Sequence, residues 1–270
     1  MAVPPETDEP GRVDVLNSDR VLANLAAADV PWTDVIVLES AGSTNTELSN
    51  AVAEGRATSG AVIAADTQTA GRGRLDRDWF SQSGATLTFS VFLSAPMSVA
   101  HFLPVLMGLA VARAIPAASD RVKLKWPNDV LVDERKAGGI LAEAASGGAV
   151  VGCGINVALR QEDLPVPEAH SLSLADINIE RSELLAHILI ELYELYQRWA
   201  EAGYHAEAAG LLDEFRRQCS TLGREVQVQL PDGGQLRGEA EDIDEAGQLL
   251  VRTTDGTQPV SVGDVIHLRH

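Results

Sequence analysis

The chain alternates between segments with a hydrophobic period of two and segments with a period close to 3.6. Leu87, Phe89, Val91 and Leu93 occupy every second position of one segment, which is typical of a β-strand with one buried face. Short apolar runs bounded by polar or glycine-containing segments indicate further strands. The strands predicted before residue 220 cover residues 35–39, 61–65, 85–93, 122–126, 130–133, 139–145 and 150–157.

Helical periodicity predicts four helices in the same part of the chain. Residues 99–115 are almost wholly apolar, so the helix there is expected to be buried. Residues 182–202 carry an apolar stripe on one face, which is expected to pack on the core. The other two helices are predicted at residues 18–28, with Ser18 as the N-cap, and at residues 46–54.

The order of these elements distinguishes between fold classes. The strands between residues 122 and 157 follow one another without an intervening helix, which argues against a doubly wound fold. We therefore expect an α+β fold around a mixed or largely antiparallel sheet. After residue 220, short strands at residues 226–230, 235–243, 248–253 and 260–268 are separated by glycine-containing turns, which is typical of a small antiparallel barrel.

Composition narrows the possible classes of function. With 21 basic and 39 acidic residues, the net charge is −18, and a chain this acidic is a poor general binder of nucleic acid. No apolar run reaches the length of a membrane span, and residues 1–10 contain no apolar secretory segment. The cysteines, Cys153 and Cys219, are isolated and form no disulfide framework. We expect a cytoplasmic protein with no nucleic-acid or membrane partner.

The lysines are confined to one segment. Only three of the 21 basic residues are lysines, namely Lys123, Lys125 and Lys136, and they lie within 14 residues. Arginine and lysine are interchangeable on a solvated surface but not at a site that requires a compact ammonium group. Chance clustering of so few residues is the alternative, but the arrangement favours a functional site.

The segment Gly71-Arg72-Gly73-Arg74 combines a flexible backbone with two guanidinium groups. Glycines allow successive N–H groups to face one anion, and arginines bind phosphate or carboxylate. For these four residues alone, an exposed turn with solvated arginines would be the simpler interpretation. The aromatic residues Trp79 and Phe80 follow this segment. They favour a loop that covers a bound ligand, one that is part apolar and part anionic.

Two further motifs surround the lysines. In Lys125-Trp126-Pro127-Asn128-Asp129, the lysine can pair with phosphate and the aspartate can bind magnesium or orient a base. A core tryptophan followed by a simple turn is a serious alternative for this segment. Lys136 precedes Gly138 and Gly139, which allow another group to approach the start of the next strand closely.

Small polar residues and glycines complete the candidate set. Ser43-Thr44-Asn45 can hydrogen-bond a ligand head group, and at least one of these residues is expected to cap the following helix. Gly152-Cys153-Gly154-Ile155-Asn156 lacks the third glycine of a dinucleotide-binding fingerprint, and its cysteine is expected to be a small buried residue. The sequence contains no P-loop, HExxH or GxSxG motif and no metal-ligand spacing.

Taken in their order along the chain, the motifs resemble those of the biotin protein ligase family, and the resemblance runs from about residue 35 to the C-terminus. The resemblance implies a catalytic domain at residues 17–220, related to lipoate ligases and class II aminoacyl-tRNA synthetases. It also implies an SH3-like barrel at residues 221–270, after a disordered tail at residues 1–16. Biotin and ATP would form biotinyl-5′-AMP, with Mg²⁺ neutralising the phosphates, and an acceptor lysine would then take the biotin.

The resemblance also implies roles by position. Arg72 would contact the biotin carboxylate, Arg74 the phosphate side, and Lys136 the reacting carboxylate and α-phosphate, while the glycine-rich loop would order over the ligand. The implied catalytic residues are Lys136, Arg72, Arg74, Lys125 and Asp129. The implied binding residues are Ser43, Thr44, Asn45 and Gln68 at the biotin ring, Gly71, Arg72, Gly73 and Arg74 in the loop, Trp79 over the adenylate, Lys136 with Gly138, and Asn156 near the adenine.

The partner implied by the family is the biotin carrier domain of a biotin-dependent carboxylase. Only 42 residues precede Ser43, so the winged helix of transcription-repressing members is not expected, and we predict a monofunctional ligase that is a monomer or a weak homodimer. A lipoate-type ligase and a non-catalytic regulator that binds biotin or adenylate are the alternatives. The segment at residues 125–129 and the C-terminal barrel favour biotin, and the intact cationic residues argue against a regulator.

Overall fold

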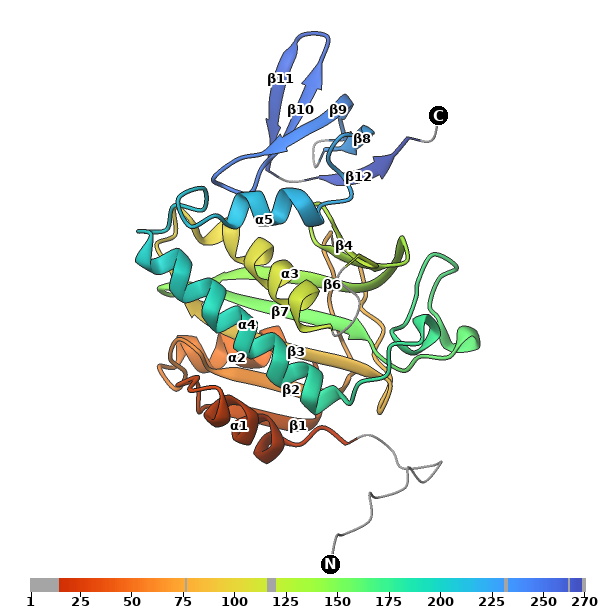
Figure 1. Ribbon diagram of the computed structural model, residues 1–270. Coiled ribbons are helices and arrows are strands. Elements are labelled where there is room, and N and C mark those ends of the chain that lie inside the picture. Colours follow the sequence, from red (N-terminus) through yellow and green to blue (C-terminus); the bar gives the residue numbers. More distant parts are fainter. Residues whose placement is uncertain (1–14, 76, 116–119, 231–232, 262, 269–270) are drawn as a thin grey trace, which may run out of the picture.

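Two β-sheets organise the protein, which is seen here in a computed structural model that describes residues 15–75, 77–115, 120–230, 233–261 and 263–268 (Figure 1). The larger sheet has the strand order β1-β2-β3-β7-β6-β5-β4. Its strands are β1 (Val35–Ala41), β2 (Val62–Gln68), β3 (Thr86–Ser94), β4 (Val122–Lys125), β5 (Asp129–Val132), β6 (Arg135–Ala145) and β7 (Gly148–Asn156). Strands β1 and β2 are parallel and the other neighbouring pairs are antiparallel. The predicted α+β fold around a mixed sheet is confirmed.

The two faces of this sheet are covered differently. The helices α1 (Ser18–Ala27), α3 (Leu103–Ala114) and α4 (Arg181–Glu201) pack together on one face, and α4 crosses in front of β3 and β7 (Figure 1). On β3, Phe89 and Val91 belong to the large core under these helices, whereas Phe92 belongs to a smaller cluster that contains Leu48 of α2 (Thr44–Ala53). Because successive side chains of a strand point to opposite faces, α2 covers the second face.

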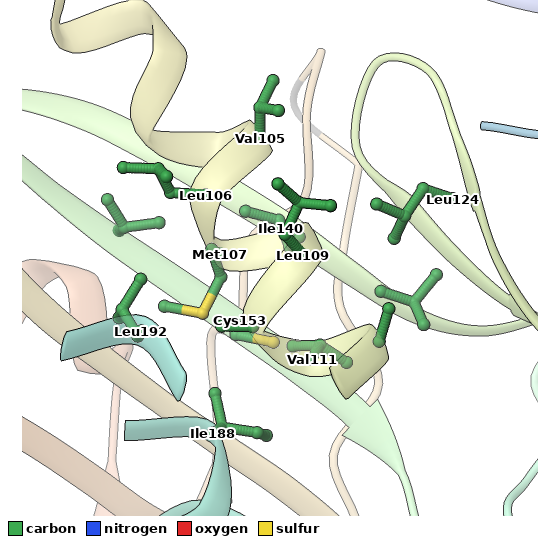
Figure 2. Close-up of a cluster of buried hydrophobic side chains, with 14 of the residues drawn as sticks. Val105, Leu106, Met107, Leu109, Val111, Leu124, Ile140, Cys153, Ile188 and Leu192 are labelled. Atoms are coloured by element: carbon green, nitrogen blue, oxygen red, sulfur yellow. The ribbon is translucent and has the colours of Figure 1, made fainter. Parts of the chain in front are cut away.

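The buried helix α3 forms the centre of the main core. Figure 2 shows Met107 and Leu109 of this helix beside Cys153 and Ile140 of the sheet, with Ile188 of α4 nearby. Burying one leucine or isoleucine side chain stabilises the fold by about 1.5–3 kcal/mol. The burial of α3 follows from its sequence, with Arg113 exposed near its end. The helix begins at Leu103, after a 3₁₀ turn at Ala100–Phe102, rather than at the predicted residue 99.

One predicted N-cap and one predicted helix start are wrong. The N-cap of α1 is Asn17 rather than Ser18, because the side chain of Asn17 accepts a hydrogen bond from the N–H of Arg20. Helix α2 begins at Thr44 rather than at residue 46. Ser43 occupies the N-cap position, as expected for one of residues 43–45, but its side chain makes no capping hydrogen bond. Instead, the N–H of Thr44 donates to Oε1 of Gln68, a residue of β2. The acceptor comes from tertiary structure, which local sequence does not encode.

The second sheet lies beyond the short helix α5 (Leu211–Gln218), which the periodicity did not reveal (Figure 1). All its neighbouring strands are antiparallel, in the order β11-β10-β9-β8-β12. The strands are β8 (Glu225–Gln229), β9 (Gln235–Ile243), β10 (Leu249–Thr253), β11 (Gly256–Val260) and β12 (Asp264–His267). The strand predicted at residues 260–268 is therefore the end of β11 plus β12. The described pairings do not join β12 to β11, and closure into a barrel stays a prediction.

The expected tail at residues 1–16 lies almost wholly outside the described residues. At its end, Leu16 is buried in the main core, and the N–H of Asn17 donates to Oγ of Ser182 at the start of α4. Ordered structure therefore begins no later than Leu16.

The two sheets are joined through Trp126, which follows β4. Its N–H donates to Oγ1 of Thr221, and its indole Nε1 donates to the carbonyl of Gly247, at 3.1 and 2.9 Å. The hydroxyl of Thr221 also lies 3.2 Å from Nε2 of His267 in β12. These contacts hold the segment after β4 against the second sheet.

We predict that His267 makes stability depend on pH. Burial, with Lys125 and Arg224 nearby, lowers its pKa from 6.5 to about 4. Between these values the unfolded chain binds more protons than the folded one, so the free energy of unfolding falls as the pH falls from about 6.5 towards about 4. Urea unfolding at about pH 7.5 and about pH 5 should show a smaller acid-induced loss in His267→Gln than in wild type. The exposed His205 offers a control, and an unchanged loss in His267→Gln would refute the prediction.

Candidate active site

A pocket of about 450 Å³ lies between α2, the loop after β2, the ends of β4 to β6 and the second sheet. This volume suits a small molecule. Its lining comprises Ser43, Thr44, Asn45, Gln68, Arg72, Gly73, Arg74, Arg77, Asp78, Trp79, Phe89, Lys125, Trp126, Pro127, Asn128, Asp129, Lys136, Gly139, Ile140, Leu141, Gly152, Cys153, Gly154, Gln229, Val265 and Ile266.

The structure brings most of the predicted site residues into this one pocket. Those that line it are Ser43, Thr44, Asn45, Gln68, Arg72, Gly73, Arg74, Trp79, Lys125, Asp129 and Lys136. Gly71, Gly138 and Asn156 are not among the lining residues. Gly71 packs against the backbone of Trp79, Gly138 packs against the carbonyl of Gly154, and the Nδ2 of buried Asn156 donates to the carbonyl of His170. The role of Asn156 near an adenine stays a prediction.

Three lining residues come from a part of the chain that the motifs did not indicate. Gln229 of β8 and Val265 and Ile266 of β12 belong to the second sheet, so both sheets build the pocket. Their side chains form no motif, and only the docking of the two sheets places them here.

Glycines leave the floor of the pocket without side chains. The register pairs Gly154 with Gly139 and Gly152 with Leu141 on the same sheet face. A Cβ at Gly154 would lie 2.3 Å from Cε2 of Trp79, and a Cβ at Gly139 would lie 3.2 Å from Cζ3 of the same indole. The close approach that these glycines permit is therefore used by a side chain of the protein itself. The Nε1 of Trp79 is buried and has no partner among the described residues.

Small polar side chains form a connected network beside this floor. Oγ of Ser90 lies 2.8 Å from Oγ1 of Thr44 and 2.6 Å from Oδ1 of Asn45, and Oγ1 of Thr44 donates to Oε1 of Gln68. Such mutual hydrogen bonds fix the orientation of each group before a ligand arrives. Ser90 was not predicted, because only the β3–β7 register places it opposite Gly152.

Cationic groups gather at the β4–β6 end of the pocket. Nζ of Lys136 lies 2.6 Å from Oδ1 of Asp129, and burial lowers the pKa of Lys125, an effect that the charge of Asp129 opposes. Burial also lowers the pKa of Arg74, whose Nη1 makes only long contacts of 3.5 Å to Oδ1 of Asn128 and to the carbonyl of Gly263. Among the described residues no carboxylate lies within ion-pair distance of Arg74. Partly desolvated cations attract an anion more strongly than solvated ones do.

The glycine-rich segment forms a short antiparallel turn at the pocket. The N–H of Gly73 donates to the carbonyl of Arg77, and the N–H of Trp79 donates to the carbonyl of Gly71. Leu75 lies in the left-handed region with φ of 56° and is exposed. The turn thus directs Arg72, Arg74 and Trp79 to the pocket, and its ordering by a ligand stays a prediction.

Both cysteines are free and buried, and burial raises the pKa of the Cys153 thiol, which suits its expected role as a small buried residue. The described residues contain no group of three or more His, Cys, Asp and Glu side chains that could hold a metal ion. Within the same residues, no helix is both long and apolar enough to cross a membrane.

Comparison with known proteins identifies the family. Residues 37–159 match the model of the Biotin/lipoate A/B protein ligase family, and residues 221–268 match that of the biotin protein ligase C terminal domain. Over 252 residues the chain is 35% identical to the biotin–[acetyl-CoA-carboxylase] ligase of Mycobacterium tuberculosis, covering 91% of this chain and 93% of that protein. The chain belongs to the biotin protein ligase family.

Two further biotin protein ligases extend this likeness. The bifunctional ligase/repressor BirA of Escherichia coli is 32% identical over 270 residues, which cover 96% of this chain and 80% of that protein. A solved structure of the biotin protein ligase from Aquifex aeolicus in complex with biotin and ATP superposes with a TM-score of 0.73 at 29% identity, covering 88% of this chain and 99% of that one. The motif resemblance is thus confirmed across most of the chain.

We predict that Gly154→Ala displaces Trp79 from the pocket floor. The added methyl group cannot coexist with the indole 2.3 Å away, so the tryptophan should become more exposed and its fluorescence emission should shift to longer wavelength. The shift should vanish when Trp79→Phe is added to the variant. Gly42→Ala is a matched control, because a Cβ there would meet no atom within 4 Å. The same emission in Gly154→Ala and Gly42→Ala would contradict this packing.

Proposed function

We propose that this chain is an ATP-dependent biotin protein ligase that makes biotinyl-5′-AMP in the described pocket and transfers the biotin to a lysine of a biotin carrier domain. The observation that carries the proposal is that the pocket is lined by both neutral hydrogen-bonding groups and cations. Neutral hydrogen-bonding groups of α2 and of the end of β2 line one part of the pocket, with Arg72 beside them, and Lys125, Lys136 and Arg74 are further lining residues, the two lysines on β4 and β6. The volume of about 450 Å³ suits a small molecule that carries both a polar ring and an anionic group.

The neutral side of the pocket is proposed to hold the biotin ring. Ser43, Thr44, Asn45 and Gln68 would bond its polar ring atoms. Their mutual hydrogen bonds support this role, because groups that are already oriented lose little entropy on binding. Arg72 would bind the carboxylate of the biotin side chain.

The cationic side is proposed to hold the phosphates and the reacting centre. A carboxylate oxygen of biotin attacks the α-phosphorus of ATP, and pyrophosphate leaves with its electron pair. The amine of the acceptor lysine then attacks the acyl carbon, and AMP leaves. Lys136, Arg74 and Lys125 would stabilise the charge that develops on the phosphate oxygens, which is the main way a pocket without a nucleophile accelerates this chemistry.

Mg²⁺ is proposed to accompany ATP, with Asp129 as the protein group that would hold it. Asp129 lines the pocket beside Lys136, and a single carboxylate fits an ion that takes most of its ligands from phosphate oxygens and water. When bound, the ion would neutralise phosphate charge.

Other parts of the proposal rest on the family and on composition. We propose residues 17–220 as the catalytic domain and residues 221–270 as the SH3-like domain, with a monomer or weak homodimer as the assembly. The buried, unpaired cysteines fit a reducing compartment such as the cytoplasm. The lipoate-type and non-catalytic alternatives are less well supported, since the named relatives are biotin ligases.

Release of pyrophosphate with ATP, Mg²⁺ and biotin tests the function directly. We expect release that depends on biotin and does not occur with lipoate. Lys136→Ala should slow it on the order of 100-fold or more, because loss of one electrostatic donor at a developing charge has this size. Lys123→Ala is the matched control, since Lys123 belongs to the same lysine cluster but does not line the pocket.

The outcomes of this assay separate the alternatives. Release with lipoate alone would identify a lipoate-type ligase. Tight biotin binding without release would identify a non-catalytic regulator. Normal turnover by Lys136→Ala would remove Lys136 from the reacting centre.

Arg74→Gly is expected to impair retention of the adenylate more than its formation. One hydrogen bond to a charged group contributes about 1.5–3 kcal/mol, so dissociation of labelled biotinyl-5′-AMP should accelerate on the order of 10- to 100-fold. Pyrophosphate release in a single turnover should change much less. Arg160→Gly, which removes an exposed arginine that does not line the pocket, should leave both rates unchanged. Equal retention in wild type and Arg74→Gly would disprove the role.

A further inference from the structure

Glu143 of β6 contacts Arg72 and Asn45, two residues that we propose to bind biotin, although Glu143 does not itself line the pocket. Its Oε2 accepts hydrogen bonds from Nη2 of Arg72 at 2.9 Å and from Nδ2 of Asn45 at 2.7 Å. Glu143 lies two residues after Leu141 and therefore projects from the same sheet face. One carboxylate oxygen thus joins the loop arginine to the polar network.

The Asn45 side of this link is rigid. Nδ2 of Asn45 also donates to the carbonyl of Leu141, and its Oδ1 accepts from Oγ of fully buried Ser90. Only the absence of a side chain at Gly152 leaves room for the amide, because a Cβ there would lie 2.2 Å from Oδ1. The amide of Asn45, and through it the carboxylate of Glu143, is therefore held at a defined position.

The Arg72 side of the link is open. Both side-chain hydrogen bonds of Arg72 use Nη2, with Glu143 and with Oγ1 of Thr46, while Nε and Nη1 bond none of the described residues. The side chain is 48% exposed, so the loop alone does not immobilise it. A guanidinium held at one nitrogen keeps its other donors for a second carboxylate.

We propose that Glu143 is a positioning residue that holds Arg72 by one nitrogen and leaves its remaining donors ready for the carboxylate of the substrate. The inference rests on the proposed function, in which Arg72 receives the biotin carboxylate. Without the negative charge of Glu143, the long side chain of Arg72 samples many rotamers. Ligand binding must then offset the conformational entropy that Arg72 loses, which weakens the affinity. The loss should affect only ligands that carry a carboxylate.

Calorimetric titration of the full chain with biotin and with the neutral amide of biotin tests this role. Glu143→Gln keeps an oxygen that can accept from Asn45 but loses the charge that holds Arg72. We expect the Kd for biotin to rise about 5- to 10-fold, as for loss of one oriented charged contact, and the Kd for the amide to stay within about twofold. Glu143→Asp, which keeps the charge, should recover part of the affinity for biotin.

Two controls show that the effect passes through Arg72. In an Arg72→Gln background, Glu143→Gln should no longer change the Kd for biotin, because the group that it positions is gone. Glu239→Gln removes a comparable ion pair, with Arg252 in the second sheet, and should leave both affinities unchanged.

The titrations distinguish a failure of this inference from a failure of the proposed function. Tighter biotin binding by Glu143→Gln would overturn the inference, because Glu143 would then compete with the substrate for Arg72. An equal loss of affinity for biotin and its amide would also overturn it, by showing a merely structural role. A wild-type chain that binds neither ligand would overturn the proposed function and the inference with it.

Discussion

The bare glycine positions on β6 and β7 are the constraint on which the pocket depends. Because Gly152 and Gly154 carry no side chain, Asn45 and Trp79 can lie directly on the sheet. A methyl group at either glycine would overlap one of these groups by more than 1 Å of normal contact distance. The two strands thus pack against α3 on one face and receive side chains of the pocket on the other, so the same strands serve the core and the site.

The two sheets complete each other at this pocket. The segment after β4 reaches the second sheet through Trp126, whose two hydrogen bonds go to Thr221 and Gly247. In return, β8 and β12 close one side of the pocket. A buried tryptophan and a binding loop were competing interpretations of this segment. Trp126 is buried and anchors the backbone that carries Asn128 and Asp129, and both of these residues line the pocket, while ligand binding by them stays a prediction.

The charge that lines the pocket is opposite in sign to the net charge of the chain. The protein carries a net charge of −18, yet five of the seven charged residues that line the pocket are cations. Lys125 and Lys136 line it and Lys123 does not, so the clustering of lysines reflects the pocket for two of the three. Cations in a partly buried pocket can still bind an anion although the chain is acidic overall, because exposed charges more than about 10 Å away are largely screened.

Local patterns were enough to predict the fold class and the core helices, and the motifs together with the family resemblance indicated eleven of the residues that line the pocket, since periodicity and glycine–arginine motifs express short-range geometry. They failed where partners distant in sequence decide the outcome. Gln68 caps α2 from another strand, Ser90 and Glu143 join the polar network through strand register, and Ile266 reaches the pocket from the second sheet. A hydrogen bond or a contact across such separations depends on how elements pack, and no window of sequence contains both partners.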